Sequence, residues 1–437
     1  MKPGNEIYKF ASKIFPYHRH LMGSGVRETL KEIKRIIPKL KIHEVKSGHK
    51  CFDWKIPLEW NIQEAFIQEI SSGKKIIDLK NNNLHILQYS TSIKKIISKK
   101  DLLKKLHYNK KLPNAIPYRT SYYKKDWGFC IKYKDLKKFN KGKYRVVINS
   151  NFFKGSMSYG ELYLSGKIKK EIFLTTYICH PSMANNEVSG PSLLTYLAKS
   201  ILNNKKRYFS YRIIFIPETI GSIYYISKNI KKLKNNVIFG INLSCVGDDG
   251  KPSIVKSLNE NTLADKIFLN IFKFEKSYNL YNYLDDRGSD ERQFNLPNVN
   301  LPIVNFSKSK FNTFKEYHTS LDNLKFISKN GFQHSYDIIN QALKICENNK
   351  VYKCLSTVEP FFENKLSTEY LKKYLTNEYI IKEDYIFMLL INIIALCNGK
   401  RDLIDISNIL NTRFEIIYQF TMYLVKIKSI KIISKTK

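Results

Sequence analysis

The chain is 437 residues long, about three times an average domain of roughly 150 residues, so two or three domains are expected. Hydrophobic residues make up 43% and aromatic residues 13% of the chain, which is enough for a sizeable core and excludes disorder over most of the length. The 74 Lys and Arg residues outnumber the 38 Asp and Glu residues and give a net charge of +36. Taken alone, that charge indicates a protein that binds nucleic acid or another anionic surface.

The basic excess is mostly lysine, and this weakens the nucleic-acid interpretation. Arginine, with its planar guanidinium group, is the side chain best suited to recognise phosphates and bases. Lysine also occurs together with abundant asparagine and isoleucine, the residue types that A/T-rich codons encode. Much of the charge is therefore expected to be solvated surface lysine, with a functional basic face as the alternative.

Cysteine usage and hydropathy predict a cytoplasmic protein. The seven Cys residues contain no CxxC pair, which favours reduced thiols over a disulfide framework or a zinc ribbon. Lys9, Lys13 and the basic run 18–20 interrupt any apolar stretch of a signal peptide. The longest apolar stretch, residues 385–397, contains Asn392 and is shorter than the ~20 residues of a membrane helix, so no membrane span is expected.

The N-terminal part of the chain changes character near residue 46. Apolar residues at helical spacing over residues 28–37 predict a helix that Pro38 ends, and residues 42–45 look extended. Residues 51–133 are aromatic and rich in turn residues, and they predict a small inserted β domain. We interpret its aromatic surface as a wall for the substrate or a contact in a homo-oligomer, with a plain structural role as the alternative.

Short apolar runs alternate with helical patterns between residues 144 and 348. The runs at 171–179, 212–216, 239–246 and 302–306 predict buried strands, and a helical stripe follows Gly190. Strands that alternate with helices predict an α/β fold, with a mixed, mostly parallel sheet between layers of helices. In such sheets functional groups gather at the carboxyl ends of the strands.

The C-terminal part is dominated by helical patterns. An apolar helix at 385–397, a short amphipathic helix at 402–410, a helix at 414–425 and a strand-like end are typical of a winged helix. DNA-binding examples insert a helix that carries Arg, Asn or Gln. Residues 413–420 contain one Arg, one Glu and many apolar residues, so this helix is better suited to packing against protein, and nucleic acid is not the expected partner.

Ionisable side chains follow several of the predicted strands. They are His180 after the first run, Glu218 after the second, Asp248 and Asp249 after the third, and His318 beyond the last. Two imidazoles and a carboxylate at one edge of a sheet suit zinc, with a further carboxylate left to activate water. The alternatives are hydrogen-bonded structural histidines, a helix cap at Glu218 and a turn at the two aspartates.

Longer motifs around these positions resemble the co-catalytic zinc aminopeptidases of clan MH type. The sequence resembles more closely a bacterial family of aminopeptidase-like proteins that is often linked to surface-polysaccharide biosynthesis loci. The motifs that carry both resemblances are residues 176–190, 216–222, 288–294 and 317–322. The insert resembles the bacterial family alone, through residues 52–60, 89–90, 116–118, 121–123 and 127–130. The resemblance implies an aminopeptidase-like α/β domain from residues 1–46 and 140–350, an inserted β domain at 47–139, and a winged helix-turn-helix domain at 351–437.

The resemblance also implies which site residues this chain keeps. His180 and His318 match two ligand histidines, and Glu218 matches the general base. The anionic ligands are mostly replaced, with Ser182 and Ser244 in two aspartate positions, Thr219 in a glutamate position, and Asn185, Asn186 and Glu187 where a metal-bridging aspartate is expected.

These replacements imply one zinc ion rather than two, because two adjacent cations need carboxylates to offset their charge. The expected ligands are His180, His318 and a carboxylate from Glu218 or Glu187, with water in the fourth position.

The expected activity is metal-assisted hydrolysis of an amide-type bond in a small peptide, aminoacyl or acylated-sugar substrate, in surface-polysaccharide biosynthesis. Glu218 is the expected base; if Glu218 is a ligand instead, Asp290 or Glu291 takes that role. The alternative is a catalytically degenerate protein that uses the cleft to bind a ligand and the winged helix to contact a partner or DNA.

Overall fold

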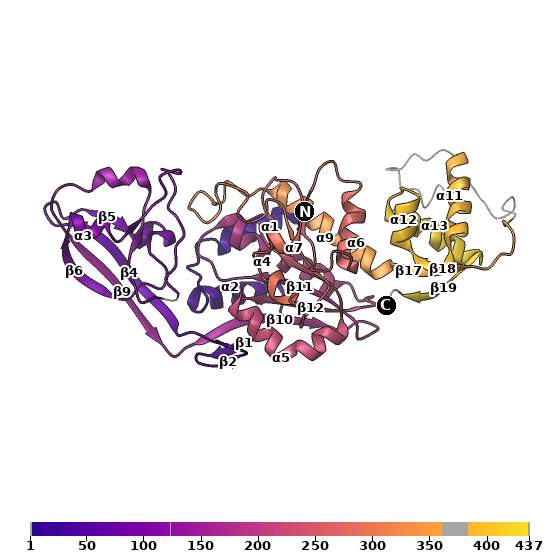
Figure 1. Cartoon of the computed structure of the whole chain (residues 1–437), viewed down its shortest axis with the longest axis horizontal. Coiled ribbons are helices and arrows are strands. Elements are labelled where there is room, and N and C mark those ends of the chain that lie inside the picture. Colours follow the sequence, from indigo (N-terminus) through magenta and orange to yellow (C-terminus); the bar gives the residue numbers. More distant parts are fainter. Residues whose placement is uncertain (1, 123, 361–382, 436–437) are drawn as a thin grey trace. The chain divides into compact units, whose positions relative to one another are not determined.

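A computed structural model describes residues 2–122, 124–360 and 383–435 of the chain (Figure 1). The chain divides into two compact units, Met1–Thr262 with Tyr278–Asp337 and Leu263–Ser277 with Ile338–Lys437. The first unit contains all of the strand-end residues that the sequence singles out.

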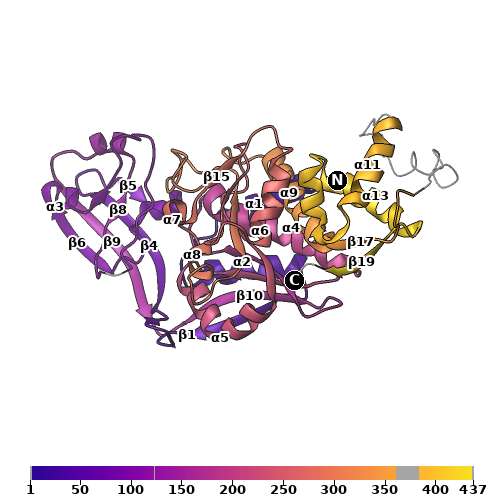
Figure 2. The same cartoon turned by 45° about the vertical axis from the view of Figure 1, so that its right-hand side comes forward.

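The first unit is built on one eight-stranded mixed sheet (Figures 1 and 2). The order across the sheet is β1 (Lys41–Lys46), β10 (Ser156–Leu164), β12 (Ser210–Ile216), β11 (Glu171–Tyr177), β13 (Val237–Leu243), β16 (Ile303–Ser307), β14 (Ser253–Val255) and β15 (Asn279–Tyr281). The four middle strands, β12 to β16, run parallel, and β10 and β14 pair antiparallel at their two sides. Every residue of β11 and β12 is buried, as expected for strands that are covered on both faces.

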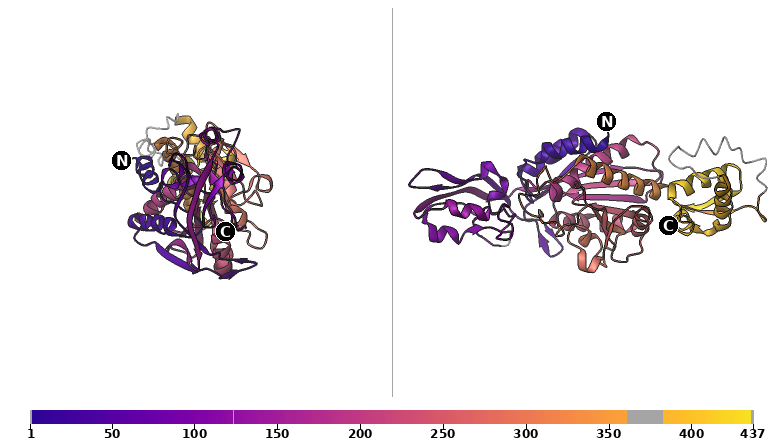
Figure 3. Two further views of the ribbon diagram at one scale, coloured as in Figure 1. Left: turned by 90° about the vertical axis from the view of Figure 1, so that its left-hand side faces the viewer. Right: turned by 90° about the horizontal axis from the view of Figure 1, so that it is seen from above.

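Helices cover both faces of this sheet (Figure 3). They include α1 (Pro3–Ile14), α2 (Ser24–Ile36), α4 (Ser189–Asn203), α5 (Ile220–Asn236) and α8 (Glu291–Phe294). On one face α4 contacts β11 and β13, and α1 and α2 pack against α4. On the other face, α5 and α8 share an apolar cluster with Phe173, Ile214 and Ile303 of the sheet. The predicted α/β fold, with a mostly parallel sheet between helices, is confirmed.

Residues between β1 and β10 form a smaller antiparallel sheet within the first unit. Its order is β5 (Lys75–Asp78), β4 (Glu59–Glu69), β9 (Lys143–Phe153) and β6 (Ile93–Ser98). The short pairs β2 (Lys50–Cys51) with β3 (Trp54–Lys55) and β7 (Leu106–His107) with β8 (Phe129–Cys130), and the helix α3 (Lys99–Leu103), accompany it. This insert has an apolar core of its own that includes Trp60, Phe129 and Tyr144. The predicted domain boundaries at residues 46, 139 and 350 stay predictions.

The second unit contains a three-stranded sheet in the order β18-β17-β19 together with several helices. Along the chain these elements are α6 (Leu263–Phe272), the end of α9 (Lys329–Asn348), β17 (Lys350–Cys354), α11 (Glu383–Leu396), β18 (Asn398–Asp402), α12 (Leu403–Ile409), α13 (Phe414–Lys426) and β19 (Ile430–Lys435). Arg413, which precedes α13, lies over the ring of Phe274 and donates a hydrogen bond to its carbonyl oxygen. Arg413 therefore serves packing within the unit, while the winged helix stays a prediction. No described helix is both long and apolar enough to cross a membrane.

The start of α4 lies very close to the strands beneath it. A Cβ atom at Gly190 would lie 2.2 Å from the hydroxyl oxygen of Thr176 and 2.9 Å from the carbonyl oxygen of Leu243. Thr176 and Leu243 are paired residues near the ends of β11 and β13. Because only glycine lets the helix approach this closely, Gly190 sets the distance between α4 and the strand ends that carry the site.

Replacing Gly190 with Ala is expected to destabilise the first unit by about 1–3 kcal/mol, because the added methyl group must push helix and strands apart. Calorimetric unfolding measures this loss, with Ser200→Ala, an exposed change in the same helix, as the control. The control is expected to stay within about 0.5 kcal/mol of the wild type. A Gly190→Ala variant as stable as the control would contradict the close approach.

Candidate functional site

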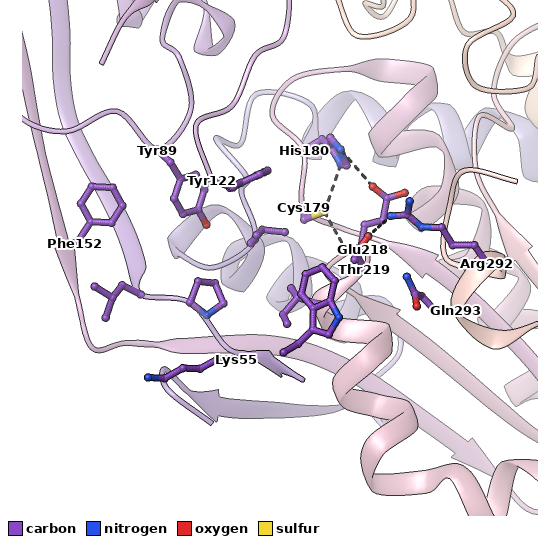
Figure 4. A pocket seen from close by; sticks show the side chains of 15 residues that line it. Lys55, Tyr89, Tyr122, Phe152, Cys179, His180, Glu218, Thr219, Arg292 and Gln293 are labelled. Carbon is purple, nitrogen blue, oxygen red and sulfur yellow. Dashed lines mark hydrogen bonds and ion pairs between the residues drawn. The ribbon is translucent and has the colours of Figure 1, made fainter. Parts of the chain in front are cut away.

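Two neighbouring parallel strands bring His180 and Glu218 together. Tyr177 and Ile216 are the last paired residues of β11 and β12, and the chain runs on from them to His180 and Glu218. The Nε2 atom of His180 lies 3.7 Å from a carboxylate oxygen of Glu218. Figure 4 shows both side chains at one pocket, next to Cys179.

The other ring nitrogen of His180 belongs to a buried chain of contacts. His180 Nδ1 lies 3.1 Å from one carboxylate oxygen of Glu187, and the other oxygen forms an ion pair with Arg19 Nε at 3.3 Å. Arg19 Nε also donates to the backbone oxygen of His180 at 3.1 Å, and a terminal nitrogen of Arg19 donates to the Ile14 carbonyl oxygen at 2.6 Å. Glu187 lies in the single π-helical turn Ala184–Val188, a backbone irregularity that is common at functional sites. Arg19 and Glu187 thus hold both the backbone and the ring of His180.

The Glu187 carboxylate stabilises a hydrogen on the Nδ1 atom of His180. A carboxylate can only accept, so Nδ1 donates the hydrogen bond to it. Burial alone would lower the pKa of His180, but the Cys179 sulfur and the Glu187 carboxylate outweigh it and raise the pKa well above the ordinary value of 6.5. Burial raises the pKa of the Cys179 thiol to about 11. Nε2 is the ring nitrogen of His180 that faces Glu218.

Asp290 and Arg292 both form hydrogen bonds with Thr219, the residue that follows Glu218. Asp290 accepts a hydrogen bond from the backbone nitrogen of Thr219 at 2.8 Å, and Arg292 donates to the Thr219 hydroxyl oxygen at 2.6 Å. Burial raises the pKa of Glu218, while His180 and Arg292 oppose that shift. Burial and the neighbouring Glu218 raise the pKa of Asp290 to about 8. Two carboxyl groups that resist ionisation together are suited to hold and pass a proton.

His318 lies beside this group, against the insert. Its ring centroid is 5.6 Å from that of His180, 3.9 Å from that of Tyr317 and 5.1 Å from that of Tyr118. The backbone nitrogen of Tyr118, in the insert, donates to the backbone oxygen of His318 at 2.8 Å. Burial lowers the pKa of His318 to about 3, so its imidazole is neutral at ordinary pH. Its buried Nε2 atom has no hydrogen-bond partner among the residues that the structure describes.

Within the described part of the chain, one group of three residues brings metal-binding atoms within 4.8 Å of one another, namely Cys179, His180 and Glu187. His318 and Glu218 do not belong to that group. An ion placed among those three atoms would lie next to the guanidinium of Arg19, which repels a cation. The Nε2 side of His180 faces the Glu218 carboxylate, although the guanidinium of Arg292 also lines that side of the pocket.

Uncharged residues stand at several positions where the resemblance expects carboxylate ligands, and their side chains form hydrogen bonds within the protein. Asn186 donates to the Tyr177 hydroxyl oxygen at 2.8 Å, and Ser244 donates to the Asn305 side chain at 3.0 Å. Glu291, the second substitute base suggested by the sequence, accepts hydrogen bonds from the backbone nitrogens of Gly288 and Ser289.

Asp248 has a structural role as well. Its carboxylate accepts hydrogen bonds from the Asn185 side chain at 2.6 Å and from the Ser309 hydroxyl group at 2.7 Å. It also accepts a hydrogen bond from the backbone nitrogen of Gly250. These contacts agree with the alternative interpretation of the sequence, in which Asp248 stabilises a turn.

The pocket in Figure 4 has a volume of about 610 Å³. Side chains from the α/β sheet loops and from the insert line it together. The sheet loops contribute Cys179, His180, Glu218 and Thr219, the short helix α8 contributes Arg292 and Gln293, and the insert contributes Trp54, Lys55, Leu58, Tyr89, Tyr122 and Phe152.

The chain matches the family described as domain of unknown function (DUF4910) over residues 8–349. The chain belongs to this family. A Clostridium acetobutylicum protein, provisionally named a polysaccharide biosynthesis protein with an aminopeptidase-like domain, is 39% identical over 406 residues, which cover 92% of this chain and 91% of that protein. The resemblance to aminopeptidase-like proteins is thereby confirmed.

Solved structures agree with this assignment. The crystal structure of a C. acetobutylicum protein, provisionally titled a peptidase, matches with a TM-score of 0.89 and 37% identity, over 98% of this chain and 96% of that one. A zinc aminopeptidase from Bacillus subtilis matches with a TM-score of 0.57 and 16% identity, over 78% and 94% of the two chains. An M28 peptidase precursor from Shewanella amazonensis matches with a TM-score of 0.55 and 11% identity, over 82% and 94%. This DUF4910 chain therefore has a peptidase-like fold.

Sequence reasoning missed the roles of Arg19 and Arg292. Arg19 lies in the basic run 18–20, which the sequence presents only as an interruption of an apolar stretch. Arg292 lies inside the motif 288–294, between candidate bases and Gln293, but nothing in that motif indicates a link to Thr219.

Replacing Glu187 with Gln is expected to destabilise the protein by about 3–5 kcal/mol, because it leaves the buried charge of Arg19 without its partner. It should also lower the pKa of His180, which an NMR titration of the imidazole measures. The control is Glu28→Gln, which removes an exposed pair with Lys31 and is expected to cost about 0–1 kcal/mol. Equal losses in the two variants would contradict the role of the Arg19–Glu187 pair.

Replacing Asp290 with Asn is expected to raise the melting temperature of metal-free protein at alkaline pH and to change it little below about pH 4. The folded pKa of about 8 exceeds the ~3.9 of an unfolded Asp, so the folded chain binds this proton more tightly. The wild type therefore loses stability as the pH rises from about 4 to about 8, and the amide removes that loss. Asp285→Asn, an exposed change nearby, is the control. A profile of Asp290→Asn parallel to that of the wild type would refute this assignment.

Proposed function

We propose that this chain is a metal-dependent hydrolase that cleaves an amide-type bond in a small peptide, aminoacyl or acylated-sugar substrate. The peptidase-like fold supports the activity, and the name of the 39% identical relative supports a place in polysaccharide biosynthesis. The observation that carries the proposal is the setting of His180. Glu187 and Arg19 hold one ring nitrogen, and the other lies 3.7 Å from Glu218 at the pocket.

The Nε2 atom of His180 and the carboxylate of Glu218 are spaced to bind one metal ion, which we take to be zinc. Two ligands of a tetrahedral zinc with bonds of about 2.0–2.2 Å lie roughly 3.4 Å apart, close to the 3.7 Å between His180 Nε2 and Glu218. His318 has a neutral imidazole with an Nε2 atom that is unpartnered among the described residues, and its ring centroid lies 5.6 Å from that of His180, so it would have to approach the ion to become a further ligand. The bond from His180 Nδ1 to Glu187 is the usual outer contact of a metal-binding histidine. We therefore assign ligation to His180, Glu218 and His318, and orientation to Glu187.

Hydrolysis joins the oxygen of water to the acyl carbon, breaks the carbon–nitrogen bond and gives a proton to the leaving nitrogen. When bound, the ion would activate the water and polarise the carbonyl group. With Glu218 as a ligand, Asp290 is the group that receives and passes on the proton, because its pKa of about 8 is close to neutral pH. Glu291 is less suited, since two backbone nitrogens already occupy its carboxylate.

The second candidate is a catalytically degenerate protein that binds a ligand in the same pocket. The hydrogen-bonded Asn186 and Ser244 favour it, because uncharged residues stand where the resemblance expects metal ligands. In that case the predicted winged helix would contact a partner or DNA, and the pocket would hold its ligand without cleaving it.

Protein purified without added zinc is expected to contain about one zinc ion per chain and to lose it in the His180→Ala and His318→Ala variants. Elemental analysis measures the content, and His49→Ala, which removes an exposed imidazole, is the control that keeps it. The same preparations are assayed on aminoacyl and acylated-sugar amides.

Wild-type protein that takes up no metal even when zinc is supplied would contradict the hydrolase proposal. Zinc that binds without hydrolysis of any of these substrates would favour the ligand-binding candidate.

A further inference from the structure

The charge of the pocket points to the kind of substrate it accepts. Among the described lining residues Glu218 is the one carboxylate, whereas Lys55, Arg292 and His180 are basic. A site for the free ammonium group of a peptide needs a carboxylate to pair with it. Glu218 already faces His180 at 3.7 Å and is assigned to the metal, so no lining carboxylate is left for an ammonium group.

Arg292 lines the pocket and interacts electrostatically with Glu218, but the two side chains do not form an ion pair. Three other buried or partly buried arginines of the first unit are paired with carboxylates, Arg19 with Glu187, Arg27 with Glu59 and Arg212 with Glu161 and Glu171. Arg292 forms no ion pair with any residue in the part of the chain that the structure describes, and its buried Nε atom has no hydrogen-bond partner. A partly buried guanidinium group with unused donors is suited to bind a carboxylate through two parallel hydrogen bonds.

Thr219 and Asp290 hold the Arg292 side chain in place. Thr219 accepts the bond from Arg292 through its hydroxyl oxygen and has a φ angle of +65°, which is strained for a β-branched residue. Asp290 accepts the backbone hydrogen of Thr219 and keeps that conformation. Strained residues persist where their position serves a site, and Thr219 holds through its hydroxyl group the Arg292 side chain, which lies at the pocket beside Glu218 (Figure 4).

The insert offers the pocket an apolar surface. Trp54, Leu58 and Phe152 line it although they are 37%, 45% and 39% exposed, and Tyr89 and Tyr122 lie with them. Large exposed apolar side chains at a pocket indicate that the ligand covers them. The pocket therefore pairs an aromatic surface from the insert with a guanidinium group from the short helix α8.

We propose that the substrate is an amide that carries a carboxylate, with Arg292 binding the carboxylate and the aromatic side chains of the insert binding an apolar or ring-bearing acyl group. This inference rests on the proposed function, because the amide bond itself lies at His180 and Glu218. It names an N-acylated amino acid rather than a peptide with a free amino terminus.

The test compares N-benzoylglycine, its uncharged amide N-benzoylglycinamide, and the free-amine probe phenylalaninamide. Calorimetry measures binding to the full-length protein as purified, and chromatography measures the release of benzoate. The wild type is expected to bind N-benzoylglycine about tenfold more tightly than N-benzoylglycinamide. Arg292→Gln should bind the two probes equally, and Arg292→Lys should keep part of the preference. Arg287→Gln removes an exposed arginine outside the pocket and should leave the preference unchanged.

Several results would overturn the inference. They are an undiminished preference in Arg292→Gln, tighter binding of phenylalaninamide, or no binding of N-benzoylglycine by the wild type at millimolar concentration. The proposed function can fail separately. If the carboxylate preference depends on Arg292 but no benzoate is released, the anion site stands and the hydrolase proposal does not.

Discussion

The buried ion pair between Arg19 and Glu187 is the contact on which the candidate site depends. It joins the segment after α1 to the turn before α4. Glu187 contacts the ring of His180, and Arg19 donates a hydrogen bond to the backbone oxygen of His180, so the pair fixes both the side chain and the main chain of this residue. Buried ion pairs add little net stability, because removing both charges from water costs about as much as their attraction returns. Their value here is orientation, since one imidazole nitrogen is tied to the protein and the other is left for the pocket.

The two sheets of the first unit contribute different parts of this site. The parallel strands β11 and β12 bring His180 and Glu218 to one edge, while the insert adds aromatic side chains and a backbone contact to His318. Positive φ angles at Thr219, Cys245 and His318 lie at this edge, and each costs about 1–3 kcal/mol. The completely buried strands beneath can offset that cost, so the strained loops rest on a rigid sheet.

The parts of the site that could be predicted from the sequence are those that depend on regular structure. Buried parallel strands leave continuous apolar runs, and their shared edge predicts that His180 and Glu218 approach each other. Arg19 could not be predicted, because it meets His180 across 161 positions of sequence through one irregular segment, which has no periodic signal. The role of Glu187 could not be predicted from the sequence either. As a carboxylate close to Ser189 and Gly190 it suggests a metal ligand, and only its contact with Arg19 indicates that it orients His180. The pairing of Arg292 with Thr219 likewise depends on a strained backbone that no local pattern announces.

The measurement that tests the central claim most directly is anomalous diffraction at the zinc edge from crystals of the zinc-treated protein. The account predicts one anomalous peak per chain, bonded to His180 Nε2 and to a Glu218 oxygen at about 2.0–2.2 Å, with Glu187 still paired to Arg19. A peak bonded to Cys179 Sγ and His180 Nδ1, two peaks about 3.5–4 Å apart, or no peak at this position would contradict it.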